Sequence, residues 1–162
     1  MAGYFRMPER TAEVLPGDGF LRTGDLGSLD ADGYLTIHGR IREVIIRGGE
    51  NIYPAEVEAA LSEHPQVVSS AVVGIADPAW GEVVGASVLL RGGTGDTGDT
   101  GDPADLEAFL AERIAHFKVP RIWRFVEEFP MTASGKIRRV IVKEEMNEGR
   151  AATGGQPGTL RS

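Results

Sequence analysis

The chain has 162 residues, of which 41% are apolar and 25% charged, and it contains no cysteine. This length and composition suit a globular domain with a core, and the missing cysteines exclude disulfides, cysteine-based zinc sites and a thiol nucleophile. The net charge of −7 argues against a nucleic-acid binder, which needs clustered Lys and Arg to neutralise phosphates.

The first 39 residues show few apolar positions and no sustained period, so Met1–Glu13 predicts no regular element. Pro16–Gly19 is typical of a turn. Asp30–Gly33 predicts a second turn, which leads into a strand at Tyr34–Ile37. A hairpin of this size cannot bury a core alone, so we expect this region to pack poorly.

From Arg42 onward the pattern becomes regular. A β-branched strand at Glu43–Ile46 ends at two glycines, and a helix begins at Pro54 and runs to about His64. Two apolar, β-branched runs then predict strands at Val67–Ile75 and Val83–Leu90.

A second helix begins at Asp102-Pro103, where apolar residues recur at helical spacing through Ile114. Arg121–Val126 predicts a third core strand, and Ile137–Met146 a terminal helix. Strands that alternate with helices predict an α+β or α/β layer, with helices flanking a sheet of three or more strands.

Two segments carry little information. Residues 92–102 contain Thr-Gly-Asp three times in succession, which indicates an expanded surface loop, because calcium-binding Gly/Asp repeats need longer periods with apolar positions. The tail, residues 147–162, is rich in Gly and Thr and is expected to be disordered.

The histidines, His38, His64 and His116, lack metal-ligand spacing and are expected at the surface or in an interface. No run approaches the roughly 18 apolar residues that a membrane span requires. The N-terminus shows no signal-peptide pattern. We therefore expect a cytoplasmic protein without a membrane span.

Ser134-Gly135-Lys136 invites comparison with a phosphate-binding Walker loop. That motif needs Gly and Ser or Thr where this chain has Pro130 and Ile137, so the comparison fails. From the residues alone, Lys136 is most simply a solvated lysine in a turn. Thr23-Gly24-Asp25 is similarly compatible with a plain turn whose carboxylate caps backbone amides.

Taken together and in order, the motifs resemble those of AMP-forming acyl-CoA synthetases. The matching segments are Phe20–Gly27 (FLRTGDLG), Gly39–Glu43 (GRIRE), Arg47–Glu58 (RGGENIYPAEVE) and Pro130–Arg139 (PMTASGKIRR). The resemblance covers about residues 1–146. It implies that residues 1–39 are a β-rich remnant of a large adenylation domain, 40–43 a hinge, and 44–146 the small C-terminal domain.

The resemblance also implies a two-step chemistry. An acid attacks the α-phosphate of ATP to give an acyl-adenylate, and a thiol, usually that of CoA, then displaces AMP. Asp25 matches the residue that accepts hydrogen bonds from the ribose hydroxyls, and Arg40 a second nucleotide contact. Lys136 matches the lysine that reaches the α-phosphate and the carboxylate, where a cation offsets the charge of an anionic attack.

In this family the small domain swings about its hinge between the two steps. Arg42 occupies the hinge position, where Asp or Lys is more common. The turn at Gly48, Gly49, Glu50 and Asn51 then faces the thiol tunnel, where glycine permits close approach of the backbone. Trp80 matches a residue near the CoA adenine in some members, although a packed surface tryptophan explains it equally well.

The family's phosphate loop, adenine pocket, magnesium-binding glutamate and acid pocket do not occur in these residues. We therefore expect Mg²⁺ to accompany ATP with ligands outside this chain, and the chain alone to be inactive. The implied substrates are ATP, CoA and a small carboxylic acid, a fatty acid or related acyl acid. The alternatives are an adenylation domain that loads a carrier protein, which usually carries a different motif at Arg47–Glu56, and a non-catalytic binding module left by truncation.

Overall fold

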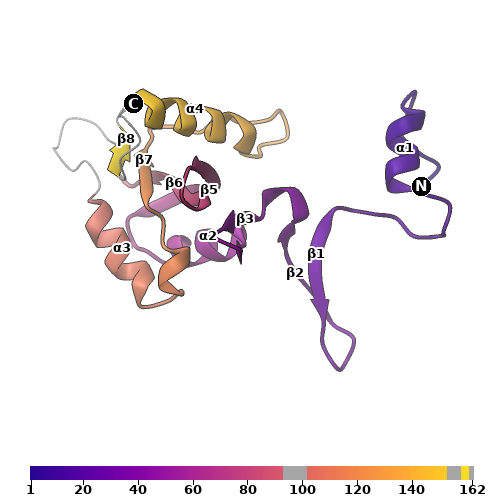
Figure 1. The fold of residues 1–162 in the computed structure, drawn as a ribbon, viewed down its shortest axis with the longest axis horizontal. Helices are drawn as coiled ribbons and strands as arrows, with labels where there is room; N and C mark the ends of the chain where they lie inside the picture. Colours follow the sequence, from indigo (N-terminus) through magenta and orange to yellow (C-terminus); the bar gives the residue numbers. More distant parts are fainter. Residues whose placement is uncertain (93–101, 153–157, 161–162) are drawn as a thin grey trace. The chain divides into compact units, whose positions relative to one another are not determined.

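The computed structural model describes residues 1–92, 102–152 and 158–160 (Figure 1). It divides into two compact units, Met1–Arg42 and Glu43–Ser162. Most of the Thr-Gly-Asp repeat lies outside the described residues, so the expectation for it stays a prediction. The expectation of a disordered tail at 147–162 is wrong where the structure describes the tail, because residues 147–152 are helical and residues 158–160 form a strand, while the rest lies outside the described residues. No helix in the described part of the chain is long and apolar enough to cross a membrane.

The unit Met1–Arg42 contains one helix, α1 (Pro8–Val14), and one antiparallel hairpin. The strands β1 (Asp25–Leu29) and β2 (Leu35–Arg40) confirm the predicted hairpin, and Asp30 Oδ1 closes its turn by accepting the amide of Tyr34 at 2.9 Å. The expectation of no regular element at Met1–Glu13 is wrong. The helix was missed because it has no apolar stripe and buries no residue.

Packing within this unit is sparse. None of residues 1–42 is buried, and Phe5 and Phe20 are 84% and 75% exposed. Since burial of apolar area is the main favourable contribution to folding, the hairpin and α1 gain little stability from their own side chains.

The unit Glu43–Ser162 is built on a mixed sheet in the order β4-β3-β6-β7-β8, with β5 also pairing with β6. The strands β5 and β6 form a long antiparallel hairpin, and β7 and β8 add in parallel. The strands are β3 (Ile45–Arg47), β4 (Glu50–Ile52), β5 (Val67–Asp77), β6 (Gly81–Leu90), β7 (Ile122–Phe125) and β8 (Gly158–Leu160).

The helices start where the sequence indicates. Helix α2 (Pro54–Ser62) has proline at its first position, and α3 (Pro103–Ala111) is capped by Asp102, which accepts the amide of Ala104 at 2.9 Å. The chain also contains two short 3₁₀ turns, η1 (Ile41–Glu43) and η2 (His116–Lys118). Helix α4 (Arg139–Ala152) continues past Asn147, where we had expected the disordered tail to begin.

Alternate residues of a strand point to opposite sides of the sheet, so apolar residues at successive positions give the sheet two faces to cover. Helices cover both of these faces. Val72, Val84 and Trp123 pack with α2 and α3 in one apolar cluster, whereas Val73 and Ile122 pack with α4 in the other. Figure 1 shows α4 on one side of β5, β6 and β7, and α2 and α3 on the opposite side. The predicted α+β class, a small sheet flanked by helices, is confirmed.

Two histidines, His38 and His116, are exposed as expected, but His64 is buried. It follows the end of α2, where its Nε2 lies 3.2 Å from Asp105 Oδ2 and its ring meets Phe109 edge-on. These contacts with α3 explain why His64 is buried. The sequence does not indicate this burial, because the contacting residues lie about 40 positions further along the chain.

The difference in packing predicts a difference in amide hydrogen exchange. Residues 1–39 should exchange orders of magnitude faster than the strands β5 and β6, because protection tracks the free energy of local opening. Exchange measured by mass spectrometry on the 162-residue chain tests this, and equal protection in both regions would contradict it.

Candidate functional site

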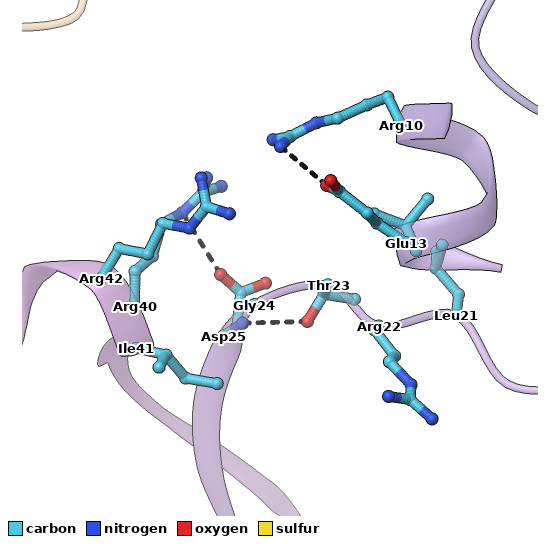
Figure 2. Close-up of a pocket in the computed structure, with 11 residues that line it drawn as sticks. Arg10, Glu13, Leu21, Arg22, Thr23, Gly24, Asp25, Arg40, Ile41 and Arg42 are labelled. Carbon is cyan, nitrogen blue, oxygen red and sulfur yellow. Dashed lines mark hydrogen bonds and ion pairs between the residues drawn. The ribbon is translucent and has the colours of Figure 1, made fainter. Parts of the chain in front are cut away.

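The two residues predicted to contact the nucleotide are cross-strand partners. Asp25 opens β1 and Arg40 ends β2, and the antiparallel register sets them opposite each other. Arg40 Nε lies 3.3 Å from Asp25 Oδ1 (Figure 2). A carboxylate has two oxygens, so this pairing through Oδ1 leaves acceptor capacity on Oδ2 for ligand hydroxyl groups.

The loop before Asp25 is held by its own polar groups. The Thr23 hydroxyl accepts the amide of Asp25 at 3.1 Å, and the carbonyl of Gly24 accepts the amide of Ile41 at 2.9 Å. These bonds fix the backbone on both sides of the Asp25–Arg40 pair.

An open pocket of about 590 Å³ surrounds this pair (Figure 2). Arginine side chains and two carboxylates gather around it, a combination that suits a ligand carrying both anionic groups and hydroxyls. Its lining residues are Arg10, Glu13, Val14, Leu21, Arg22, Thr23, Gly24, Asp25, Arg40, Ile41 and Arg42.

Arg42, the predicted hinge residue, is the last residue of the unit Met1–Arg42. The predicted hinge, residues 40–43, therefore spans the boundary at which the chain divides. Its motion is not tested by a single structure and stays a prediction.

Lys136 lies in a tight loop between β7 and α4. Thr132 closes the loop from both ends: its amide donates to the Lys136 carbonyl at 2.7 Å, and its hydroxyl accepts the Lys136 amide at 3.0 Å. Gly135, with φ of +75°, makes the turn between them. Lys136 itself is exposed, and within the described ranges no hydrogen bond or ion pair engages its Nζ. The backbone is fixed while the ammonium is available to a ligand.

Gly48 and Gly49 form the two-residue turn between β3 and β4. Their φ values, +57° and +94°, are both positive, as the type I′ hairpin turn requires, which explains the glycine pair. Glu50 and Asn51 follow in β4 with exposed side chains.

Trp80 packs directly on this turn. Its carbonyl accepts the Gly48 amide at 2.9 Å, and the Arg47 guanidinium lies 4.4 Å from its ring centroid. A Cβ on Gly48 would lie only 2.7 Å from the indole ring. Trp80 is still 47% exposed, so it is packed on one side and open on another. The structure thus brings together the five residues predicted for the thiol side.

Asp77 holds the turn that carries Trp80. Its Oδ1 accepts the amides of Ala79 and Trp80, each at 3.0 Å, and its Oδ2 accepts Arg150 Nη2 at 2.7 Å. The hydrogen bond from Arg150 is the main reason that the pKa of Asp77 lies below its ordinary value of 3.8, although burial opposes the shift. Sequence reasoning missed Arg150, because it falls in the segment predicted to be disordered.

The described residues contain no cluster of three or more His, Asp or Glu side chains that could hold a metal ion. The expectation that Mg²⁺ accompanies ATP is not tested by this observation and stays a prediction.

Comparison with known proteins gives concordant matches. The family described as AMP-binding enzyme C-terminal domain matches residues 56–136. The medium-chain acyl-CoA ligase ACSF2 of Rattus norvegicus is 43% identical over 148 residues, which are 91% of this chain and 23% of that protein. The sulfoacetate–CoA ligase of Cupriavidus necator is 45% identical over 140 residues, 86% of this chain and 26% of that protein.

Among solved structures, o-succinylbenzoate CoA synthetase from Bacillus subtilis, in complex with its acyl-adenylate intermediate, superposes with a TM-score of 0.79. It is 36% identical, and the match covers 88% of this chain and 28% of that one. The chain therefore spans about a quarter of the length of the proteins it matches.

The two glycines of the turn should respond differently to alanine. Both changes force a side chain into positive φ, which costs about 1–2 kcal/mol. Only Gly48→Ala also places a methyl group against the Trp80 ring. We expect Gly48→Ala to destabilise more and to shift the indole N–H resonance of Trp80, whereas Gly49→Ala leaves that resonance in place. NMR distinguishes Trp80 from Trp123, whose indole donates to Glu107. Equal shifts of the Trp80 indole resonance in both variants would contradict the packing of Trp80 against Gly48.

The pKa of Asp77 predicts a pH dependence of stability. Because the folded-state pKa is lowered, the Asp77–Arg150 pair stabilises the fold above the ordinary pKa of 3.8, and this contribution is lost as pH falls through the folded value. Asp77→Asn should therefore lower the free energy of unfolding at pH 7, and the difference from the parent should shrink below pH 3.8. Urea unfolding of both proteins at pH 7 and below pH 3.8 measures the two free energies. A difference between parent and variant that does not change with pH would refute the prediction.

Proposed function

The chain belongs to the family of AMP-binding enzyme C-terminal domains, and on that basis we propose that it forms the C-terminal part of an AMP-forming acid–CoA ligase. The observation that carries the proposal is Lys136, an exposed cation on a loop whose backbone is fixed by Thr132. The whole ligase activity extends beyond the quarter of such enzymes that this chain matches.

In the first step, a carboxylate oxygen of the acid bonds to the α-phosphorus of ATP, and the bond to the pyrophosphate oxygen breaks. Negative charge accumulates on the phosphoryl oxygens as two anions meet. The Lys136 ammonium offsets this charge in the transition state. Asp25 accepts hydrogen bonds from the ribose hydroxyls, and Arg40 adds a second contact to the nucleotide.

In the second step, the thiol of CoA loses its proton to solvent, its sulfur bonds to the acyl carbon of the adenylate, and AMP leaves with the electrons of the acyl–oxygen bond. The Gly48-Gly49 turn lines the path of the thiol, since no side chain there narrows it. Glu50 and Asn51 flank the path, and the open part of the Trp80 ring offers a stacking surface for the CoA adenine.

The two steps need different faces of the small domain, so the proposal includes rotation about Arg42. The positions of Lys136 and of the Gly48 turn on separate elements, the β7–α4 loop and the β3–β4 hairpin, support this division of labour.

The acid is proposed to be a fatty acid or a related acyl acid, with Mg²⁺ accompanying ATP and no nucleic-acid partner. The matched relatives act on different acids by name, a medium-chain acyl substrate in the rat protein and sulfoacetate in the Cupriavidus necator protein. A cytoplasmic location is part of the proposal, while the rat relative is described as mitochondrial.

A chimera tests the proposal, in which this chain replaces the matching quarter of the Cupriavidus necator sulfoacetate–CoA ligase. In single-turnover kinetics, Lys136→Ala should slow formation of the adenylate by about 10²–10³-fold, the usual loss on removing one charge-stabilising group. It should spare thiol transfer from synthetic adenylate. Gly49→Leu should do the reverse, because its side chain would project into the thiol path.

Gly49→Ala separates the effect of bulk from that of backbone strain, which both Gly49 variants share. The proposal that the two steps use different faces of the small domain is wrong if Lys136→Ala slows both steps equally. A folded chimera that forms no adenylate contradicts the proposed function, and one that acylates a carrier protein in place of CoA supports the alternative acceptor.

A further inference from the structure

Arg139 is the first residue of α4, three positions after Lys136. A cation in the first turn of a helix is disfavoured by the helix dipole, so a buried or half-buried arginine there needs compensating carboxylates. The structure supplies two of them.

The Arg139 guanidinium is bound by Glu58 of α2 and Glu43 of η1. Its Nη1 and Nη2 donate to the two carboxylate oxygens of Glu58, the Nη2–Oε2 distance being 2.8 Å, and its Nε lies 3.5 Å from Glu43 Oε2. The hydrogen bonds to Glu58 are the main reason that the pKa of Arg139 is raised, against the effect of burial. Bidentate pairing of this kind fixes the orientation of both side chains.

Glu58 is itself held by the sheet. Its Oε1 accepts the amide of Val72 in β5 at 2.8 Å, and Arg139 Nη1 reaches the carbonyl of the same residue at 3.4 Å. With a side chain only 16% exposed, Glu58 is a fixed anchor rather than a solvated surface acid.

Contacts beside Arg139 hold the base of the lysine loop. The Arg138 amide donates to the Pro130 carbonyl at 2.8 Å, Met131 and Ile137 form an isolated antiparallel bridge, and Ile137 packs against the apolar cluster under α4. Only Ile137 and Arg138 separate Arg139 from Lys136, and both take part in these contacts.

We propose that Arg139 is a positioning residue for Lys136: it fixes the lysine loop relative to α2, β5 and Glu43, the residue that follows Arg42 in the predicted hinge. Because the lysine is assigned to the first step, Arg139 serves adenylate formation and not thiol transfer. The inference rests on the proposed function of Lys136, but it concerns a residue that does not touch the substrate.

The other ion pairs of α4 attach the helix elsewhere and provide a matched control. Lys143 Nζ pairs with Glu82 Oε1 at 2.9 Å, on the same helix but without a contact to the lysine loop among the described interactions. Lys143→Met removes one charge and one ion pair from α4, and Arg139→Met removes one charge and two ion pairs, but only Lys143→Met leaves the loop anchored.

The test uses the chimeric ligase and follows each half-reaction. Arg139→Met should slow adenylate formation by about 10–100-fold, since misplacement of a catalytic group by about 1 Å costs up to about 100-fold. Thiol transfer should stay within about threefold, and Lys143→Met should leave both steps within about threefold. Glu58→Gln, which keeps side-chain volume and an acceptor for the Val72 amide, should reproduce the Arg139→Met pattern, and it serves as the variant if Arg139→Met does not fold.

A double variant distinguishes positioning from a general structural role. If Arg139 acts through Lys136, Lys136→Ala/Arg139→Met should be no slower in adenylate formation than Lys136→Ala alone, because coupled residues are not additive. The inference is overturned if the losses of the two single variants multiply in the double variant. It is also overturned if Arg139→Met slows both half-reactions equally, or if it leaves the rate of adenylate formation unchanged. If Lys136→Ala itself has no effect, the proposed function fails instead.

A readout that does not depend on activity complements the kinetics. In the 162-residue chain, Arg139→Met should accelerate tryptic cleavage after Lys136 several-fold, and Lys143→Met should not. Cleavage at the same rate in all three proteins would overturn the anchoring of the loop, whatever the kinetics of the chimera.

Discussion

The packing of α4 on the sheet is the interaction on which the predicted catalytic regions of Glu43–Ser162 depend. Val142 and Met146 are buried against β5, β6 and β7. Gly85 makes this possible, because a Cβ there would lie 3.0 Å from Met146 Cε and 2.6 Å from Ile75. Close packing of this kind resists small displacements, so the two ends of α4 are held at defined positions relative to the sheet. One end adjoins the Lys136 loop, and the other binds the turn of Trp80.

The two ends of α4 carry arginines in opposite electrostatic settings. Arg150 lies in the last turn, where the helix dipole favours a cation, and it binds Asp77 and the carbonyl of Ala76. Arg139 lies in the first turn, where the dipole disfavours it, and it is correspondingly paired with Glu58 and Glu43. Two carboxylates surround the guanidinium and offset this unfavourable position, an arrangement that the positioning role proposed for Arg139 requires.

The sequence predicts elements whose cause is local and fails where the cause is distant. The strands at Val67–Ile75 and Val83–Leu90 follow from their β-branched runs, and the start of α3 follows from Asp102, which caps it as expected. The Arg139–Glu58 pair joins residues 81 positions apart, and no periodicity or composition signals it. The motif resemblance identified Asp25 and Arg40 separately, while their pairing depends on the hairpin register, which includes a bulge after Leu26.

The fixed backbone of the Lys136 loop lowers the entropy cost of placing the flexible lysine side chain in its proposed role. Thr132 fixes the loop backbone, so a ligand needs to order only the lysine side chain, at a cost of up to about 2 kcal/mol. A charge-stabilising group typically lowers a barrier by about 3–4 kcal/mol, measured after such costs have been met. If the backbone also had to be ordered, at about 1–2 kcal/mol for each residue of a five-residue loop, the ordering cost would exceed that gain. In the role proposed for Lys136, the hydrogen bonds of Thr132 therefore remove the larger ordering cost before a ligand binds.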